Sequence, residues 1–341
     1  MKELYYKLNS YFNIIKKDLR YKFPLPFYKK IVLWRKGFLA EKYVLYRMDS
    51  NPTNLFLSDY HTSLARWIND PFIDVLTNKL IFGEIVGQYI SVPKIFGWIF
   101  TGIYYPKTNL KLLELLSKEE IIVIKGVTGG GGKFVYIVKL NDDHILVNNK
   151  NKYSENEFLN FTSKLDNYIV TEFIKQGSFA ASLNNDSVNT MRIVTMIDPD
   201  THKPFIARAV QRIGVKNSIP MDNFTKGGLS SMIDIETGKL SDATTHPNSI
   251  KHIRVSKHPE NGSQIEDRVI PNWDMVKTKL LTASANLPML KVIGWDLVIT
   301  DNDVIAIEGN HHPDPDVLQA HGPLLTNEQI VKFYKFYKIL K

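Results

Sequence analysis

The sequence of 341 residues predicts an α+β fold. Short amphipathic segments of helical period alternate with apolar runs of strand length, and short turns separate most of these runs, as in hairpins. The length fits about two domains. The chain changes near residue 117 from helical and aromatic-rich to strand-rich, and its pattern changes again near residue 185. We therefore expect four regions, which span residues 1–60, 61–116, 117–185 and 186–341.

Positive charge is concentrated in the first region, which is expected to be largely helical. Residues 1–43 contain eleven Lys or Arg and three acidic residues, which accounts for the net charge of +8. They also contain eleven aromatic residues, and Pro24 and Pro26 end the first predicted helix. This pattern fits either an amphipathic helix packed on the body with a solvated lysine face, or a contact with a membrane surface. The chain shows no zinc-finger, RNP or recognition-helix motif, so no nucleic acid is expected.

Apolar periodicity places the remaining elements. Helices are expected at 78–90, 107–120, 153–165 and 273–285. Strands are expected at 121–125, 134–138, 144–148, 167–174, 190–198, 205–214, 292–300 and 304–310. An extended link surrounds Pro93.

Composition excludes several classes of function. The chain has no cysteine, which removes disulfides, thiolate nucleophiles and cysteine-ligated metal sites. The first ten residues lack the apolar core of a signal peptide, and Ile95–Pro106 is too short to span a bilayer. We expect a cytoplasmic location, with peripheral contact at the inner face of the membrane as the alternative for the basic N-terminal region.

Residues 129–132 are four consecutive glycines between two predicted strands. Without a Cβ atom, backbone N–H groups can approach an anion closely, and Lys125 and Lys133 supply charge for a polyphosphate. The segment is not a Walker A loop, because Phe134 occupies the Ser/Thr position and a strand follows. It is either a flexible loop that closes over nucleotide phosphates, which we favour, or a plain hairpin tip.

The last predicted hairpin brings two carboxylates together. A three-residue turn pairs Thr300 with Val304, and the same register places Asp296 opposite Glu308. A two-residue turn would separate the pair. The prediction therefore depends on the turn.

Asp296, Glu308 and Asn310 then emerge on one face, with Val298, Val304 and Ala306 as their neighbours. Two carboxylates about 5 Å apart repel by about 3 kcal/mol at an effective dielectric near 20. A hard cation would convert this repulsion into attraction, and two carboxylates with an amide oxygen suit Mg²⁺. The alternative is a solvated carboxyl pair that shares a proton.

Arginines on two neighbouring strands are further candidates. Arg192 projects from 190–198, whereas Arg208 and Arg212 share one face of 205–214. Such side chains can bind phosphate or carboxylate in bidentate fashion, or form structural ion pairs. The tail after the hairpin matches no zinc motif, so its polar residues are interpreted as loop residues beside an active site. These are His311, His312, Asp314 and Asp316.

A lysine before a glycine-rich hairpin loop, followed much later by an Asp…Glu-x-Asn hairpin, resembles an ATP-grasp enzyme. More narrowly, the chain resembles the sugar-transfer-associated ATP-grasp family, found with bacterial surface-polysaccharide genes. The resemblance covers about residues 75–325 and rests on four motifs: NKLIF (78–82), SVNTMRIVT (187–195), DNFTKGGLSSMID (222–234) and IGWDLVITDNDVIAIEGN (293–310).

The resemblance implies two ATP-grasp subdomains that grip ATP, and a role for each matching position. Lys79 and Lys125 match lysines that reach the nucleotide phosphates, and Arg192 matches the arginine beside the γ-phosphate. Gly129, Gly130, Gly131 and Gly132 match the loop, where Lys133 departs from a usually longer glycine run. Glu172, Phe173 and Ile174 match the hinge that binds adenine, and Asp296, Glu308 and Asn310 match the magnesium ligands. The motif Asp222–Gly228 matches without a derivable role.

The family resemblance implies an ATP-dependent, ADP-producing carboxylate–amine ligase with ATP and Mg²⁺ as cofactors. Its expected product is an amide between an amino acid and a sugar component of a capsule or other surface polysaccharide. Arg192 and Lys125, with Arg208 as a further candidate, are expected to act in catalysis. The alternatives are a kinase that phosphorylates a hydroxyl group, and a nucleotide-binding scaffold at a membrane glycan-assembly complex.

Overall fold

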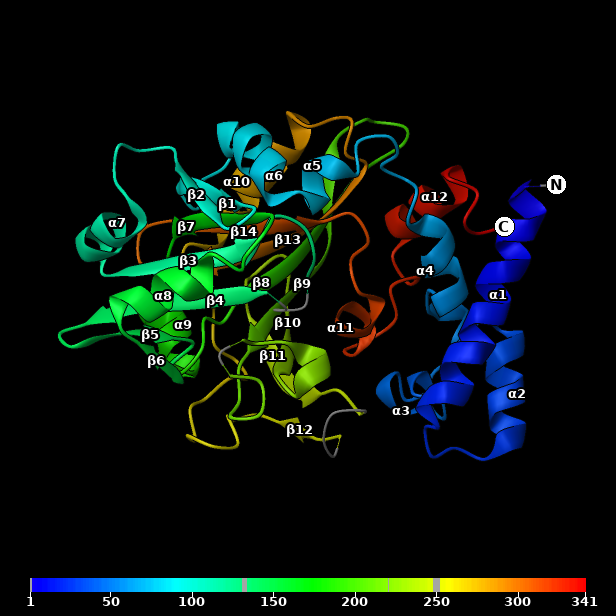
Figure 1. Ribbon diagram of the computed structural model, residues 1–341. Coiled ribbons are helices and arrows are strands. Elements are labelled where there is room, and N and C mark those ends of the chain that lie inside the picture. The colour runs from blue at the N-terminus through cyan, green and yellow to red at the C-terminus, as the bar shows by residue number, and fades with distance from the viewer. Residues whose placement is uncertain (1, 131–133, 220, 248–251) are drawn as a thin grey trace.

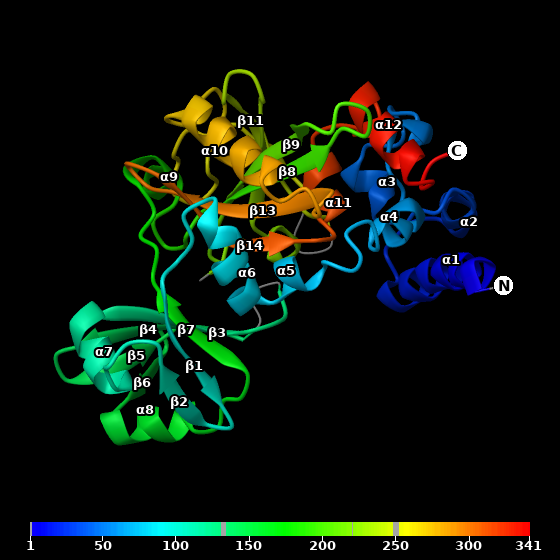
Figure 2. The same ribbon diagram turned by 90° about the horizontal axis from the view of Figure 1, so that it is seen from above.

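The computed structural model describes residues 2–130, 134–219, 221–247 and 252–341. Two seven-stranded sheets form two lobes, and helices pack around both (Figures 1 and 2). All strand pairings within the described ranges are antiparallel. The predicted α+β class is therefore confirmed.

The smaller lobe is built on the first sheet. Its strands are β1 (Ile95–Phe100), β2 (Ile103–Pro106), β3 (Ile121–Gly126), β4 (Val135–Asn141), β5 (His144–Val147), β6 (Asn151–Tyr153) and β7 (Tyr168–Glu172). They lie in the order β2-β1-β7-β3-β4-β5-β6. Its apolar core joins strand residues such as Ile122 and Val138 to Leu116 and Phe158 from the two covering helices.

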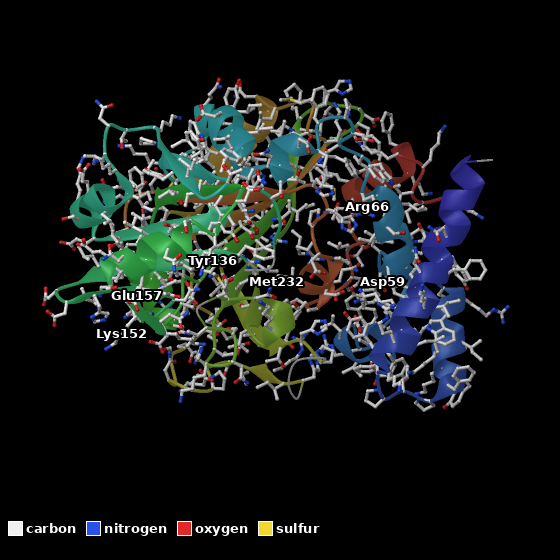
Figure 3. All side chains as sticks on the ribbon, in the orientation of Figure 1. Asp59, Arg66, Tyr136, Lys152, Glu157 and Met232 are labelled. Carbon is white, nitrogen blue, oxygen red and sulfur yellow. The ribbon has the colours of Figure 1, made fainter. Side chains whose placement is uncertain are left out.

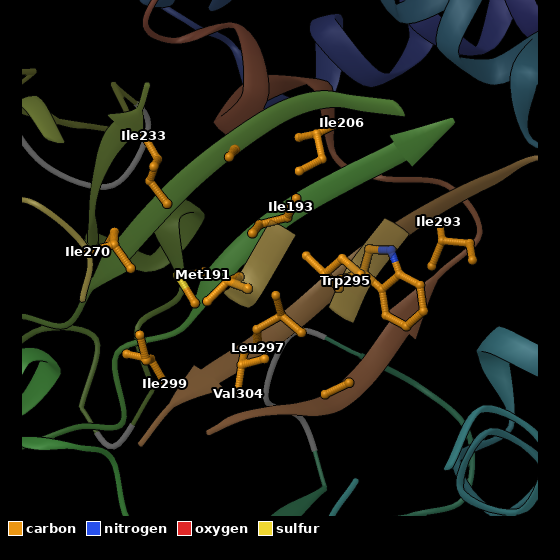
Figure 4. Close-up of a cluster of buried hydrophobic side chains, with 14 of the residues drawn as sticks. Met191, Ile193, Ile206, Ile233, Ile270, Ile293, Trp295, Leu297, Ile299 and Val304 are labelled. Atoms are coloured by element: carbon orange, nitrogen blue, oxygen red, sulfur yellow. The ribbon is translucent and has the colours of Figure 1, made fainter. Parts of the chain in front are cut away.

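The larger lobe is built on the second sheet. Its strands are β8 (Met191–Ile197), β9 (Pro204–Ile213), β10 (Leu229–Ile233), β11 (Leu240–Thr245), β12 (Arg254–Val255), β13 (Val292–Ile299) and β14 (Val304–Asn310). They lie in the order β12-β11-β10-β9-β8-β13-β14. Ile293, Trp295, Leu297 and Ile299 alternate along β13 and enter one buried cluster, because strand side chains have a period of two (Figure 4).

The helices complete both lobes and form the N-terminal region. They are α1 (Lys2–Tyr21), α2 (Phe27–Arg35), α3 (Lys42–Leu45), α4 (Asp59–Ala65), α5 (Asp74–Thr77), α6 (Lys79–Ile85), α7 (Leu112–Glu119), α8 (Glu155–Thr162), α9 (Ser178–Leu183), α10 (Trp273–Ala285), α11 (Pro315–Gln319) and α12 (Glu328–Phe336), with 3₁₀ turns η1 (Thr53–Leu55), η2 (Val86–Gln88) and η3 (Phe224–Lys226). Helices α7 and α8 pack on the smaller sheet, and α10 packs on β8 and β9 of the larger sheet.

The N-terminal region packs on the larger lobe. Helix α1 ends at Tyr21, before the two prolines, as the sequence predicts. Buried Leu33, Leu45 and Phe56 join a second apolar cluster with Val194 and other residues of the larger sheet. Among the helices that the structure describes, none has the length and apolar character needed to cross a membrane.

Two regions differ from the expected division. Strands β1 and β2 lie within 61–116, which was expected to be helical, and they join the smaller sheet. Helix α9 lies before residue 185, yet Ala180 and Leu183 belong to the core of the larger lobe. Short apolar runs cannot be assigned to helix or strand by periodicity alone, which explains the missed strands.

Candidate functional site

A cavity of about 380 Å³ lies between the two sheets. Its volume falls in the range of about 300–1,000 Å³ that is typical of small-molecule sites. Residues expected to bind ATP and magnesium line it, namely Lys79, Lys125, Glu172, Phe173, Ile174, Arg192, Asp296, Glu308 and Asn310. Residues that are far apart in the sequence therefore meet at one place between the lobes.

The carboxylate pairing predicted from the hairpin is confirmed. Asp296 on β13 lies opposite Glu308 on β14, and Gly294 lies opposite Asn310. The three polar side chains consequently face the cavity. Asn310 donates its side-chain N–H to the Gly294 carbonyl at 3.3 Å, which directs its amide oxygen away from that bond.

The strands reach this register by a different path from the predicted one. Val304 pairs with Ile299 rather than with Thr300, so the connection has four residues. A β-bulge at Ile307 then adds one residue to β14 and restores the opposition of Asp296 and Glu308. The extra residue shifts the alternation of β14 side chains by one position at the bulge. Side chains of β14 before the bulge therefore point to the opposite face of the sheet from the one that an unbroken strand would give them. Val304 and Ala306 therefore lie in the core of the larger lobe and not beside the carboxylates.

The bulge also provides a partner for Lys125. The Lys125 ammonium donates to the Ile307 carbonyl at 3.3 Å, from β3 of the smaller lobe to β14 of the larger one. Burial lowers the pKa of Lys125 to about 8; Glu308 opposes this shift and the charge of Lys79 adds to it. A buried cation with one neutral acceptor is well suited to bind an incoming anion.

Asp296 is held by two arginines. Arg192 donates from Nε and Nη2 to the two oxygens of the Asp296 carboxylate. Arg212 donates from Nη2 to one of these oxygens at 3.1 Å. Burial favours the neutral acid, but the two guanidinium groups outweigh it and hold the pKa of Asp296 well below its usual range. Asp296 is therefore a carboxylate at neutral pH.

Glu308 has the opposite electrostatic environment. Burial and the adjacent charge of Asp296 raise its pKa, while Lys79 opposes the shift from 3.9 Å away. Carboxylates that repel one another at close range form a site that a divalent cation stabilises. Two carboxylates and an amide oxygen are hard ligands, so the side chains of Asp296, Glu308 and Asn310 fit Mg²⁺.

Lys79 connects the glycine segment to the larger lobe. It begins α6, where the Asn78 side chain caps the helix by accepting from the backbone N–H groups of Leu80 and Ile81. The Lys79 ammonium donates to the Gly129 carbonyl at 2.7 Å. A Cβ atom at Gly129 or Gly130 would meet no neighbour within 4 Å, so the described start of the glycine segment is open. Gly131, Gly132 and Lys133 lie outside the described residues.

The expected hinge follows β7. The Glu172 carboxylate accepts from the backbone N–H of Lys94 at 3.2 Å, which ties the end of β7 to the segment that enters β1. Phe173 and Ile174 continue from β7 toward the larger lobe and line the cavity. Glu172–Ile174 therefore lies between the two sheets, which is where a hinge that contacts adenine is expected to lie.

Arg208 lies outside the cavity, contrary to its expected catalytic role. It shares strand β9 and a face with Arg212, but it donates to the carbonyl of Pro323 at 2.9 Å and contacts the sulfur of Met232. The shared face predicted from alternation is correct. The cavity does not extend along the whole face, because the chain around Pro323 covers that end of the sheet.

Several lining residues were not predicted as site residues. Thr190 hydroxyl and backbone N–H both donate to Asp222, at 2.6 and 2.7 Å, and Arg212 donates to the Thr190 hydroxyl. The motif at Asp222 thus supports the arginines beside the carboxylates. Thr190 precedes Arg192 by two residues, so strand alternation could have identified it.

The tail after β14 contributes two more lining residues, His312 and Asp314. The N-terminal region holds this tail, because His312 Nε2 lies 2.8 Å from the Thr62 carbonyl and Lys42 forms an ion pair with Asp316. The prediction that these residues lie beside the site is confirmed for His312 and Asp314.

Comparison with known proteins places the chain in a family. A model of the sugar-transfer-associated ATP-grasp family matches residues 60–332, which is well over half of the chain. A search among curated proteins found no match.

Solved ATP-grasp structures resemble the chain at low identity. The ATP-grasp ligase PsnB complexed with its minimal precursor is 13% identical, with a TM-score of 0.40 over 80% of this chain and 69% of that one. D-alanine–D-alanine ligase from Bacillus anthracis is 14% identical, with a TM-score of 0.38 over 78% and 66%. N5-carboxyaminoimidazole ribonucleotide synthetase from Thermotoga maritima is 10% identical, with a TM-score of 0.38 over 75% of this chain and 44% of that one, so the chain spans less than half of that synthetase. On the strength of the family match, this chain belongs to the sugar-transfer-associated ATP-grasp family.

Proposed function

We propose that this chain is an ATP-dependent carboxylate–amine ligase that proceeds through an acyl phosphate. The observation that carries the proposal is the composition of the inter-lobe cavity. Lys79, Lys125 and Arg192 supply positive charge on one side, and Asp296 and Glu308 supply a cation site beside them. This combination suits MgATP, because a nucleotide triphosphate needs both cations and a bound divalent ion.

The chain's own residues would bind and orient the reactants. Lys79 and Lys125 would contact the phosphates, and the segment Glu172–Ile174 would contact adenine. Asp296, Glu308 and Asn310 would hold Mg²⁺, which neutralises charge that develops on the transferred phosphoryl group. Arg192, fixed by its contact with Asp296, would stabilise the same charge.

Two steps complete the reaction. A substrate carboxylate oxygen attacks the γ-phosphorus, the bond to the β-phosphate oxygen breaks, and ADP leaves. An amine then attacks the acyl carbon, orthophosphate leaves, and the amine loses a proton as the amide forms. A protein nucleophile is not required, in agreement with a chain that contains no cysteine.

The substrate class is part of the proposal, and the family description supports only its sugar component. The product would join an amino acid to a sugar component of a bacterial capsule or other surface polysaccharide. We place the reaction in the cytoplasm, where ATP is available, with peripheral contact at the inner face of the membrane.

Calorimetry of MgATP binding tests the nucleotide site. The wild type should bind MgATP in a magnesium-dependent manner, and Glu308→Gln should weaken binding at least tenfold. Glu236→Gln, an exposed position in the larger lobe, is the matched control and should bind as the wild type does. Wild-type protein that does not bind MgATP would overturn the proposal.

Trapping with hydroxylamine tests the chemistry. Candidate amino acids and uronic acids are incubated with MgATP and hydroxylamine, and a ligase should yield an acyl hydroxamate with ADP and orthophosphate. A kinase would instead yield ADP and a stable phosphoester without hydroxamate. That product would replace the ligase with the kinase alternative.

A further inference from the structure

Exposed apolar side chains gather where α1 turns into α2. We define the α1–α2 corner as residues 19–32. It exposes six large apolar residues: Leu19, Tyr21, Phe27, Tyr28, Ile31 and Val32. Phe27 and Tyr28 are 62% and 66% exposed. A monomeric protein seldom exposes so many large apolar side chains within fourteen residues unless they meet a partner.

The arrangement within α2 is a face and not scattered exposure. Phe27 and Ile31 are four residues apart, as are Tyr28 and Val32, so all four lie on one side of the helix. The next residues, Leu33 and Trp34, are buried against the body. The helix is thus anchored on one side and presents an apolar surface on the other.

The corner carries an excess of positive charge: Arg20, Lys22, Lys29 and Lys30 lie within it, and the exposed Asp49 is the acid that acts on Lys29. Arg20 and Lys22 are exposed, Lys30 is partly exposed, and 19–40 contain no Asp or Glu. Asp18, the acid that directly precedes the corner in the sequence, is only 1% exposed.

The interior of the helix pair accounts for the burial of Asp18. It accepts from the indole N–H of Trp34 at 2.8 Å and from the backbone N–H of Ala40 at 3.0 Å. These bonds tie α1 to α2 and to the chain after it. They also withdraw the charge of Asp18 from the surface, so the four basic side chains outnumber Asp49 and the corner has a net positive charge.

We propose that the α1–α2 corner docks on an anionic lipid surface. Aromatic and aliphatic side chains would enter the interface between headgroups and acyl chains, while the basic side chains would pair with anionic headgroups. Charge complementarity selects this occupant, since a surface with a net positive charge matches anionic lipid. The inference specifies the residues of the peripheral membrane contact proposed above, and it does not depend on the ligase chemistry.

Co-sedimentation of the full chain with vesicles tests the inference. One set of vesicles contains phosphatidylcholine alone, and the other contains equal parts of phosphatidylcholine and phosphatidylglycerol. The protein should bind only the anionic vesicles, and added salt should weaken the binding. Binding should fall at least tenfold in the triple variant Arg20→Glu, Lys22→Glu and Lys30→Glu.

A matched control makes the same change of charge elsewhere. Lys118→Glu, Lys152→Glu and Lys164→Glu are exposed lysines of the smaller lobe, and Lys152 lies at the end of the molecule opposite α1 and α2 (Figure 3). This variant should keep its vesicle binding within about twofold of the wild type. An equal loss in both variants would show a general charge effect and overturn the assignment to the corner.

A second variant tests the apolar contribution. Tyr28→Ser with Val32→Ser should weaken vesicle binding, whereas Ile103→Ser with Leu159→Ser, exposed in the smaller lobe, should not. MgATP calorimetry on the same variants shows whether each protein is folded and keeps its nucleotide site. Folded wild-type protein that fails to bind anionic vesicles overturns the inference, whether or not it binds MgATP or captures a protein or nucleic acid at this surface.

Discussion

Arg192 and Asp296 lie opposite each other on neighbouring strands β8 and β13, and the guanidinium group contacts both oxygens of the carboxylate. Arg212 reaches the same carboxylate from β9. The acid proposed to bind magnesium is therefore already ionised and oriented by two cations. The arrangement places positive charge next to the proposed metal, where the phosphoryl group would be transferred.

Arg192→Met should weaken MgATP binding at least tenfold, because it removes a cation that lines the cavity. Arg208→Met is the matched control, since Arg208 is on the neighbouring strand but outside the cavity. It should bind MgATP within about twofold of the wild type. In urea unfolding Arg192→Met should lose about 3–5 kcal/mol, because it breaks a buried ion pair with Asp296, whereas Arg208→Met breaks no ion pair within the described residues and should lose less. Equal effects of the two substitutions on calorimetric affinity would contradict the assignment.

Lys125 should give MgATP binding a pH dependence. Its pKa in the folded protein is about 8, so the free protein loses this charge as the pH rises above that value. The dissociation constant should therefore increase by up to about tenfold per pH unit above 8. Calorimetry across this range should show the change in the wild type and a much flatter profile in Lys125→Arg, because arginine stays charged.

The same group affects stability with the opposite sign. Its pKa falls from 10.5 to about 8 on folding, so between these values the unfolded chain binds more protons than the folded chain. The contribution of Lys125 to the free energy of unfolding should therefore rise with pH across this window. A difference in slope between the wild type and Lys125→Met in urea titrations at several pH values would measure it.

Lys42 should be essential for stability. Its side chain is 2% exposed and forms ion pairs with Glu41, Asp59 and Asp316, so Lys42→Met removes the cation that these three acids share. The loss should be about 3–5 kcal/mol in urea unfolding. Lys36→Met removes an exposed lysine and should cost no more than about 0.5 kcal/mol. Adding Asp316→Asn to Lys42→Met should restore part of the loss, and no restoration would argue against uncompensated charge as the cause.

Gly309→Ala should disturb the site by displacing α5 and α6, which pack against β14. A Cβ atom at Gly309 would lie 2.6 Å from Leu76 and 2.9 Å from Phe82, which is closer than packing allows. The displaced α5 and α6 carry Lys79, so MgATP affinity should fall together with about 1–3 kcal/mol of stability. Gly262→Ala is the control, because a Cβ there meets nothing, although its positive φ adds a local cost. Calorimetric affinity unchanged in Gly309→Ala would show that the helices accommodate the methyl group.

Much of the site could be predicted because its residues follow local rules. Strand alternation and hairpin pairing are enough to bring Asp296 opposite Glu308. The bulge at Ile307 could not be predicted from the hairpin alone. The carbonyl of Ile307 accepts a hydrogen bond from Lys125, which is distant in the sequence. The prediction of the pair and of Val298 as its neighbour was right, whereas the turn was wrong and Val304 and Ala306 lie on the other face.

Other features depended on tertiary packing. The aromatic run in β1 fits a helix or a strand equally well by pattern, and its pairing with β7 decides the outcome. By strand alternation, Arg208 and Arg212 lie on the same face of β9. Their surroundings differ because the chain segment around Pro323 covers Arg208. Such distinctions arise from which segments cover a sheet, which a single sequence does not encode locally.

The bond from Lys79 to the Gly129 carbonyl has a consequence for how a ligand would enter. An ammonium group has three hydrogens, and here one of them already serves a backbone oxygen of the other lobe. An arriving phosphate would compete with that oxygen for the same proton donor. Nucleotide binding would then cost the bond that holds the backbone at Gly129, so substitutions that strengthen this bond should weaken nucleotide affinity.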